Sequence, residues 1–171
     1  MDSKQMTRQK GVTLIELIIA MTIITITLFI GVPNLQRLVK NNEIINQSNT
    51  IASFLAFARS EATKRKSDVR LCRGKIVEDA AECSTDGGNL LILNNADALI
   101  RTAELNTNIN FYFQNLTSST ITFSALGVPD DTGEIVLCDD RGSSYAKGIA
   151  LNMGGQVRSL VDSEINNISC S

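Results

Sequence analysis

The chain of 171 residues contains no histidine and no tryptophan, and it has only two prolines. Without histidine, the serine and cysteine triads that use an imidazole as general base are excluded. Aromatic residues make up 5% of the chain, whereas hydrophobic residues make up 43%. This composition fits a folded domain with a small, strand-rich core, and no feature of it favours an enzyme. We therefore expect no catalytic residues and no cofactor.

Cysteine is scarce, and its spacing excludes the usual metal patterns. None of the four cysteines belongs to a C-x-x-C pair, and with no histidine present the sequence offers no zinc-binding motif. Two disulfides in an exported domain fit the pattern better, although four buried free thiols are the alternative. Of the three pairings, closeness in sequence favours the first cysteine with the second. The residues are Cys72, Cys83, Cys138 and Cys170.

Charge is nearly balanced along the chain, at a net −2. The first 11 residues carry +2, so residues 12–171 carry −4. A mildly acidic body argues against strong, sequence-independent binding to nucleic acid, which depends on neutralising phosphates. Paired carboxylates occur at Asp130–Asp131 and Asp139–Asp140. Each pair lies in or beside a predicted turn, where aspartate bonds the backbone, so we expect turns rather than a calcium site.

One long hydrophobic run is present, from residue 12 to Val32, and it contains a single charge, Glu16. Its 21 residues would span roughly 31 Å as a helix, which matches a bilayer core of about 30 Å. Basic residues precede the run and should keep that end in the cytoplasm. The sequence therefore predicts a single membrane-spanning helix, with the rest of the chain on the far side.

The cleavage signal of an ordinary secretory peptide is missing after this run. A small residue, Gly11, stands before the run instead, and a cut there would free an amine at Val12 beside the membrane. Glu16 is costly in a bilayer unless it lies near the interface or is paired. Both alternatives stay open: headgroup depth, or pairing with a positive charge on a neighbouring chain.

Residues 10–17 read Lys-Gly-Val-Thr-Leu-Ile-Glu-Leu after a polar, basic leader. This stretch resembles the class III signal of type IV pilins and type II secretion pseudopilins. The resemblance implies that a prepilin peptidase cuts after Gly11 and methylates the amine of Val12. It also implies that Glu16 recruits and registers the subunit in a filament, and that Pro33 bends the helix. Val12 departs from the family, which most often has phenylalanine at this position.

Apolar residues continue at three- and four-residue steps beyond Pro33, and basic residues follow near Arg65. This pattern predicts an amphipathic helix that packs on the following domain. We divide the chain into a leader over 1–11, a membrane and filament-core helix over 12–33, an amphipathic half over 34–66, and a β domain over 67–171.

The period changes to two from Asp68 onward, which indicates strands. Turn residues separate them, and Gly154–Gly155 predicts a hairpin. Short strands without intervening helices indicate antiparallel sheets laid on the helix. The fold class is α+β, and the resemblance implies the type IV pilin fold, a long bent N-terminal helix packed on two small sheets. The expected strands are 68–73, 89–93, 99–105, 109–113, 120–124, 134–138, 148–152 and 156–160.

Residues 135–142 and 150–158 resemble the minor-pilin group called FimU and FimT, to which the pseudopilin GspH also belongs. The implied function is that of a structural minor pilin in assembly initiation and in the tip complex of a type IV pilus. The alternatives are a GspH-like pseudopilin and a FimT-like pilin that binds DNA for transformation. Some FimT-like pilins bind DNA through a Gly-Arg-x-Arg motif. Residues 155–158 here read Gly-Gln-Val-Arg, which leaves Arg158 as the candidate contact and nucleic acid as a less favoured partner.

The resemblance also implies partners and a location. The expected partners are the major pilin, other minor pilins, the prepilin peptidase and the inner-membrane assembly platform. The chain should cross the inner membrane once, with its N-terminus in the cytoplasm before cleavage and its β domain in the periplasm. It should then enter a pilus at the cell surface.

Overall fold

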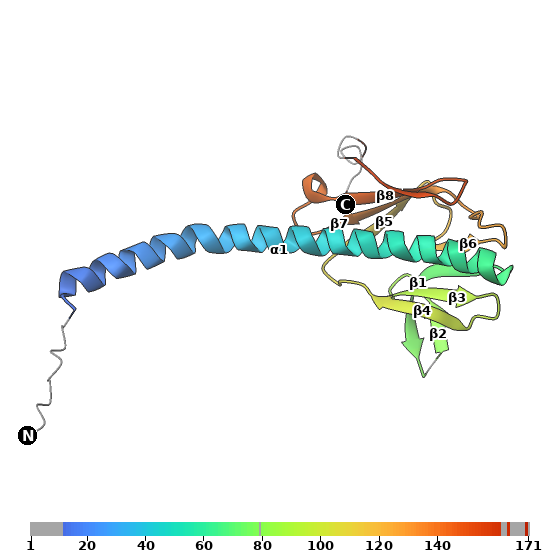
Figure 1. Cartoon of the computed structure of the whole chain (residues 1–171), viewed down its shortest axis with the longest axis horizontal. Coiled ribbons are helices and arrows are strands. Elements are labelled where there is room, and N and C mark those ends of the chain that lie inside the picture. Colours follow the sequence, from blue (N-terminus) through green and yellow to red (C-terminus); the bar gives the residue numbers. More distant parts are fainter. Residues whose placement is uncertain (1–11, 79, 162–163, 165–169, 171) are drawn as a thin grey trace, which may run out of the picture. The chain divides into compact units, whose positions relative to one another are not determined.

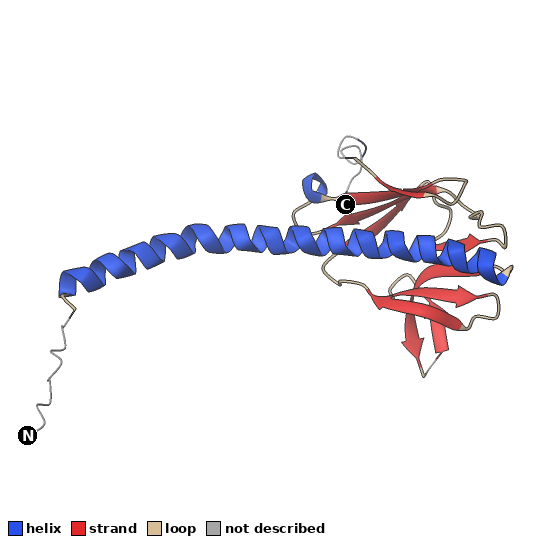
Figure 2. Cartoon of the chain, in the orientation of Figure 1, coloured by secondary structure: helices blue, strands red, loops and turns tan. Residues whose placement is uncertain are grey.

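The structure is a computed structural model that describes residues 12–78, 80–161, 164 and 170. One helix, α1 (Leu14–Arg65), precedes all the strands (Figure 1). Two units follow from the packing, residues 1–40 and 41–171, and each is described by itself. Figure 2 separates helix, strand and loop. The strands are β1 (Val69–Val77), β2 (Ala80–Cys83), β3 (Asn89–Asn94), β4 (Leu99–Glu104), β5 (Asn110–Gln114), β6 (Thr120–Phe123), β7 (Gly133–Cys138), β8 (Lys147–Leu151) and β9 (Val157–Ser159).

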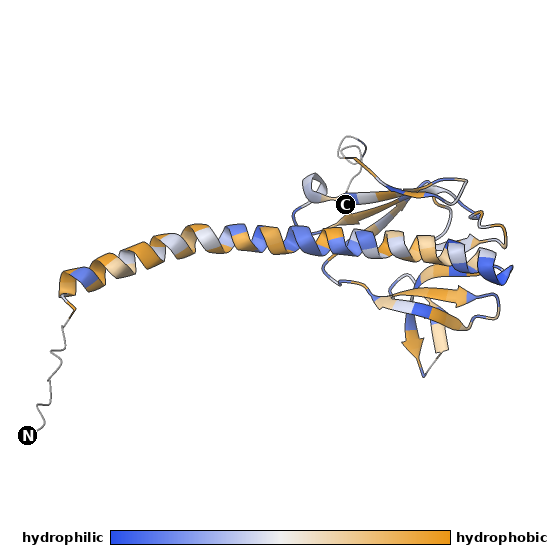
Figure 3. Ribbon diagram, in the orientation of Figure 1, coloured by the Kyte–Doolittle hydropathy of each residue, from blue (hydrophilic) through white to orange (hydrophobic). Residues whose placement is uncertain are grey.

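In the first unit, the described part of α1 is a helix with an apolar surface, coloured mostly orange in Figure 3. Three threonines interrupt this surface, and each hydroxyl donates to a backbone carbonyl one turn earlier. The bonds run from Thr22 to Ile19, from Thr25 to Met21 and from Thr27 to Ile23, at 2.8, 2.7 and 2.8 Å. Because the hydroxyls are satisfied within the helix, they place no unpaired polar group in an apolar surrounding.

Pro33 lies inside α1, and the helix continues through it. Proline has no N–H, so the carbonyl of Phe29 loses its usual helical partner. The side-chain amide of Asn34 donates to the carbonyl of Ile30 at 3.0 Å, one position further along the helix. The bend at Pro33 stays a prediction.

The second unit contains the C-terminal part of α1, and its buried side chains follow helical spacing. Ile44, Ile51, Leu55, Ala58 and Ala62 are all 2% exposed or less. The helix ends at Arg65, as expected near the basic residues. The predicted apolar pattern also included three residues before Lys40, and these are exposed because they belong to the first unit. They are Leu35, Leu38 and Val39.

Two antiparallel sheets pack on this part of the helix, as predicted. In the first, the order is β2-β1-β3-β4, with β6 also paired to β1; in the second it is β5-β7-β8-β9. Figure 1 shows β1, β2, β3 and β4 of the first sheet below α1, and β5, β7 and β8 of the second sheet above it. One core contains helix residues together with Leu71 and Ile121 from the first sheet and Leu137 and Ile149 from the second. The C-terminal part of the helix, from Ile44 onward, and both sheets therefore share one core.

Two disulfides fasten the β domain. Cys72–Cys83 joins β1 to β2, and Cys138–Cys170 joins β7 to the C-terminal segment. This is the pairing that closeness in sequence favoured. Next to the second bridge, the Tyr112 hydroxyl donates to the carbonyl of Cys170 at 2.9 Å. The bridge and this bond both fix the C-terminal segment on the second sheet.

The eight predicted strands are present with boundaries close to those expected, and so is the hairpin between β8 and β9. One strand was missed. β2 reads Ala-Ala-Glu-Cys, which has no β-branched residue, and it forms by pairing with an extension of β1 to Val77. The short 3-10 helix Ser143–Tyr145 was also missed.

Candidate assembly site

The apolar surface at the start of α1 is the first candidate functional feature. Between Val12 and Val32, the large hydrophobic side chains are 46–78% exposed. This helix is long and apolar enough to cross a membrane by length and composition. Monomeric soluble proteins rarely expose apolar surface on this scale. Lipid or the helices of other subunits must therefore cover it.

Glu16 lies in the first turn of α1, where a carboxylate interacts favourably with the helix dipole. The hydroxyl oxygen of Thr13 accepts a hydrogen bond from the backbone N–H of Glu16 at 3.4 Å. Thr13 and Glu16 thus have the spacing of a capping box, Thr-x-x-Glu, which the sequence reasoning overlooked. The Thr13 hydroxyl therefore caps the start of α1, and the Glu16 carboxylate lies where it favours the helix dipole, in addition to any role between subunits.

The predicted cleavage site is only partly visible. Gly11 and the leader lie outside the described residues, while Val12 is described and is 69% exposed. An amine created at Val12 would lie four residues before Glu16 in the same chain. The cleavage, the methylation and the pairing of Glu16 therefore stay proposals.

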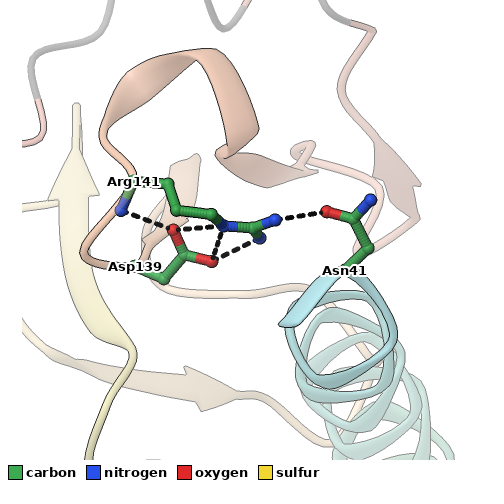
Figure 4. Close-up of polar contacts among 3 residues, drawn as sticks. All are labelled: Asn41, Asp139 and Arg141. Carbon is green, nitrogen blue, oxygen red and sulfur yellow. Dashed lines mark hydrogen bonds and ion pairs between the residues drawn. The ribbon is translucent and has the colours of Figure 1, made fainter. Parts of the chain in front are cut away.

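A polar cluster lies at the beginning of the second unit, where the loop after β7 meets α1 (Figure 4). The Arg141 guanidinium donates through Nε to both carboxylate oxygens of Asp139, at 2.9 and 3.1 Å. Its Nη1 donates to the side-chain oxygen of Asn41 at 2.7 Å, and its Cζ lies 4.3 Å from the centroid of the Tyr145 ring. We call these four residues the Arg141 clamp.

The Arg141 clamp is largely withdrawn from solvent. The side chains of Arg141 and Asp139 are 13% and 7% exposed. Hydrogen bonding to Asp139 raises the pKa of Arg141 further, against the opposing effect of burial. Such a pair is costly to break, because removing one partner leaves a buried charge uncompensated. The clamp thus fixes the β7–β8 loop to α1 at Asn41, the first residue of the second unit.

The carboxylates of the predicted Asp130–Asp131 pair bond the backbone of turns. Asp131 accepts hydrogen bonds from the backbone N–H and the hydroxyl of Thr117 and from the N–H of Thr132. These bonds lower its pKa, those from Thr117 most. Asp130 accepts from the N–H of Thr122 at 2.8 Å. Both side chains therefore bond the backbone as predicted for turn residues, and the described residues contain no group of three or more potential metal ligands.

Arg158, the candidate DNA contact, projects from β9 and is bonded to a carboxylate. Its two terminal nitrogens donate to the two oxygens of Glu164 at 2.9 and 2.8 Å. Hydrogen bonding to Arg158, together with the N–H of Val161, lowers the pKa of Glu164 to about 2. Arg158 therefore already has a carboxylate partner within the chain, and a phosphate would have to compete with Glu164.

This pairing gives a testable expectation. Because the folded-state pKa of Glu164 lies below the ordinary value, the ion pair is complete above about pH 4.5 and is lost as the pH falls through about 2. At neutral pH we expect no salt-sensitive retardation of DNA by the full chain in detergent. Glu164→Gln should expose the cation and strengthen any retardation, with Glu164→Gln/Arg158→Ala as the matched control. Retardation by the unmodified chain that Arg158→Ala abolishes would contradict this expectation.

A further cation was missed by the sequence reasoning. Arg59 of α1 and Arg158 of β9 line one groove of about 610 Å³ between the helix and the β8–β9 hairpin. Arg59 donates through Nε to the carbonyl of Gly127 at 3.2 Å. The helical pattern gave no reason to single out Arg59, because the meeting of α1 with this hairpin depends on tertiary packing.

The fold resembles solved pilin structures. The type IV minor pilin FimU of Pseudomonas aeruginosa is 16% identical, with a TM-score of 0.58, over 74% of this chain and 94% of that chain. The minor pseudopilin EpsH of the type 2 secretion system of Vibrio cholerae is 10% identical, with a TM-score of 0.51, over 70% and 97%. At these identities the likeness supports the fold. No curated protein matched the sequence.

Two family models match the chain itself. The prokaryotic N-terminal methylation motif matches residues 6–32, which contain the predicted cleavage site and Glu16. The model described as type II transport protein GspH matches residues 47–155, which contain every buried residue of α1 except Ile44 and the strands β1 to β8. Since that match extends over more than half of the sequence, the chain belongs to the GspH family of pilin-like minor pilins and pseudopilins.

Proposed function

We propose that this chain is a minor pilin of a type IV pilus that helps to initiate assembly and lies near the tip. The observation that carries the proposal is the exposed apolar surface of α1 between Val12 and Val32. In the bilayer, lipid covers this surface; in a filament, the equivalent helices of other subunits replace the lipid. One helix can thus serve both as membrane anchor and as filament core.

The N-terminal chemistry belongs to the same proposal. A prepilin peptidase cuts after Gly11 and methylates Val12, and the carboxylate of Glu16 pairs with the freed amine of a neighbouring subunit. The match to the N-terminal methylation motif supports this assignment. Before cleavage the leader is cytoplasmic and the β domain is periplasmic, so the inner-membrane assembly platform can receive the subunit from the bilayer.

In the filament, the β domain lies outside the helical core. We assign it the task of linking other minor pilins to the major pilin. The Arg141 clamp supports this role, because a domain fastened to its helix at Asn41 presents its loops in a defined position relative to the part of α1 that begins at Asn41.

A pseudopilin of a type II secretion system is the second candidate, favoured by the description of the matching family as a type II transport protein. The architecture is the same, so the machinery in which the subunit acts must be identified in cells. The discriminating experiment deletes the gene and scores twitching motility, protein secretion and DNA uptake in parallel.

We expect the deletion to reduce twitching and surface piliation and to leave secretion unchanged. The processed chain should appear in sheared pili, with Val12 as its methylated first residue by mass spectrometry. Complementation by the intact gene is the control. Lost secretion with normal twitching would overturn the type IV assignment in favour of the pseudopilin.

A further inference from the structure

Two turns of the β domain have the same backbone design and touch each other. In each, the N–H of the fourth residue donates to the carbonyl of the first, from Gly127 to Ser124 at 2.7 Å and from Gly155 to Asn152 at 2.8 Å. Both glycines have a positive φ, +74° and +70°. A Cβ on Gly155 would lie 2.6 Å from the carbonyl oxygen of Gly127, so the two backbones approach as only glycine permits.

Each turn presents a large apolar side chain to solvent beside this contact. Leu126 is 83% exposed and Met153 is 79% exposed, and they lie one and two residues from the touching glycines. Among the large hydrophobic side chains of the second unit that the structure describes, these two are the most exposed. Neither contributes to the core, so the folded domain gives no reason for an apolar residue at either position.

A cationic groove adjoins the two turns. It has a volume of about 610 Å³ and is lined by Arg59 and Arg158, together with Gly155 and Gln156 of the second turn. Arg158 holds the carboxylate of Glu164 through both terminal nitrogens. Arg59 donates through Nε to Gly127, and no carboxylate of a described residue forms an ion pair with it. A guanidinium has five N–H donors, so Arg59 can donate hydrogen bonds to an anionic partner and still keep its bond to Gly127.

We propose that this groove receives a carboxylate side chain from the β domain of a neighbouring pilin subunit, and that Leu126 and Met153 pack on apolar residues beside that carboxylate. The inference rests on the proposed function, since the partner is another subunit of the same filament. Charge complementarity selects an acidic segment, because planar guanidinium groups bind carboxylates through paired hydrogen bonds. The Arg158–Glu164 pair shows the same chemistry within this chain.

The composition of the surface favours protein over nucleic acid as the occupant. Two exposed apolar side chains gain from contact with other apolar groups and nothing from a phosphate backbone. One of the two arginines is already paired, and residues 12–171 carry a net negative charge. An apolar pair beside a charged groove resembles the centre and rim of a protein–protein interface.

The test places p-benzoylphenylalanine at position 126 or 153 of the full chain, in cells that make the filament, and irradiates them. The matched control carries the same probe at Val77, an exposed apolar residue of β1 that is 49% exposed. We expect positions 126 and 153, but not 77, to give an adduct whose second component is another pilin subunit by mass spectrometry. Adducts with DNA or lipid alone would overturn the proposal.

Charge variants then test the groove itself. Arg59→Glu should lower the yield of the adduct by about tenfold, whereas Arg59→Lys, which keeps the charge, should keep most of it. Because Arg59 also bonds Gly127, its replacement could disturb the turn, so a second variant is needed. Met153→Ser, with the probe at position 126, changes only an exposed side chain and leaves the fold intact. An unchanged yield in both Arg59→Glu and Met153→Ser overturns the proposal. Detection of the chain in sheared pili separates the failures: its absence overturns the proposed function, and its presence with an unchanged yield overturns the groove alone.

Discussion

Replacing Glu16 by alanine is expected to reduce incorporation of the chain into pili by roughly 30- to 160-fold, while the chain stays anchored in the membrane. An unpaired charge at the centre of a membrane helix costs about 2.5–3.5 kcal/mol, and a charge in the first turn, as at Glu16, costs less. In the proposed filament, pairing with the N-terminal amine of a neighbour would remove that cost only in the assembled state, so the carboxylate would favour assembly by about 2–3 kcal/mol. An alanine side chain is not charged and has no such cost in the bilayer, so assembly gains nothing from it.

The capping box at the start of α1 supplies an alternative explanation, and the chain offers a matched control for it. Glutamine is accepted at this position of a capping box, so Glu16→Gln keeps the helix start and removes the charge. Glu16→Asp keeps the charge on a shorter side chain. If pairing between subunits is the reason for Glu16, glutamine should fail like alanine, whereas aspartate should restore part of the incorporation.

The measurement is an immunoblot of the chain in sheared pili against the chain in the membrane fraction. Equal amounts of all variants in the membrane would show that anchoring and stability are unaffected. Normal incorporation of Glu16→Ala would sink the assembly role. Normal incorporation of Glu16→Gln with loss in Glu16→Ala would assign Glu16 to helix capping instead.

The long helix and most of the β domain could be predicted because their signals are local. A long, mostly apolar run is followed by apolar residues at three- and four-residue steps as far as Ala62, and this pattern specifies a helix regardless of its neighbours. The strand β2 could not be predicted in this way. Its alanines have low strand propensity, and pairing with β1 and the Cys72–Cys83 bridge supply its stability instead.

The site shows the same division. Glu16 and Val12 stand out in the sequence because one is the only charge in the apolar run and the other follows its flanking glycine. The groove between Arg59 and Arg158 joins residues 99 positions apart, and the contact of Gly127 with Gly155 fixes its edge. No periodicity encodes such a meeting. The Thr13 cap could have been found, since Thr-x-x-Glu before an apolar run is a known helix-start signal.

Replacing Arg141 by leucine should lower the free energy of unfolding of the β domain by about 3 kcal/mol, the usual range when one partner of a buried ion pair is removed. The carboxylate of Asp139, whose side chain is 7% exposed, would then lack its guanidinium. Asn41 would lose its bond from the loop at the same time. For a domain of this size, the midpoint of thermal unfolding should fall by roughly 10 °C.

The matched control is the exposed arginine–carboxylate pair of the same domain. Arg158 and Glu164 form the same two-pronged contact, but their side chains are 58% and 36% exposed, so Arg158→Leu should have a much smaller effect. The double variant Asp139→Asn/Arg141→Leu should recover part of the loss, because no charge stays buried without a partner. Differential scanning calorimetry of the full chain in detergent measures all three.

The position of the Arg141 clamp gives a second readout that a general loss of stability would not produce. Arg141 reaches α1 at Asn41, before the first buried helix residue, Ile44. Releasing this contact should speed amide exchange around Asn41 more than at Leu55, deep in the core, in conditions where the domain stays folded. If exchange rises equally at both positions, or if Arg141→Leu and Arg158→Leu lower the unfolding midpoint equally, the Arg141 clamp does not fasten the loop to the helix. A selective rise at Asn41 would instead show that one buried arginine sets where the helix is fixed to its domain, and therefore which part of α1 remains available to neighbouring subunits.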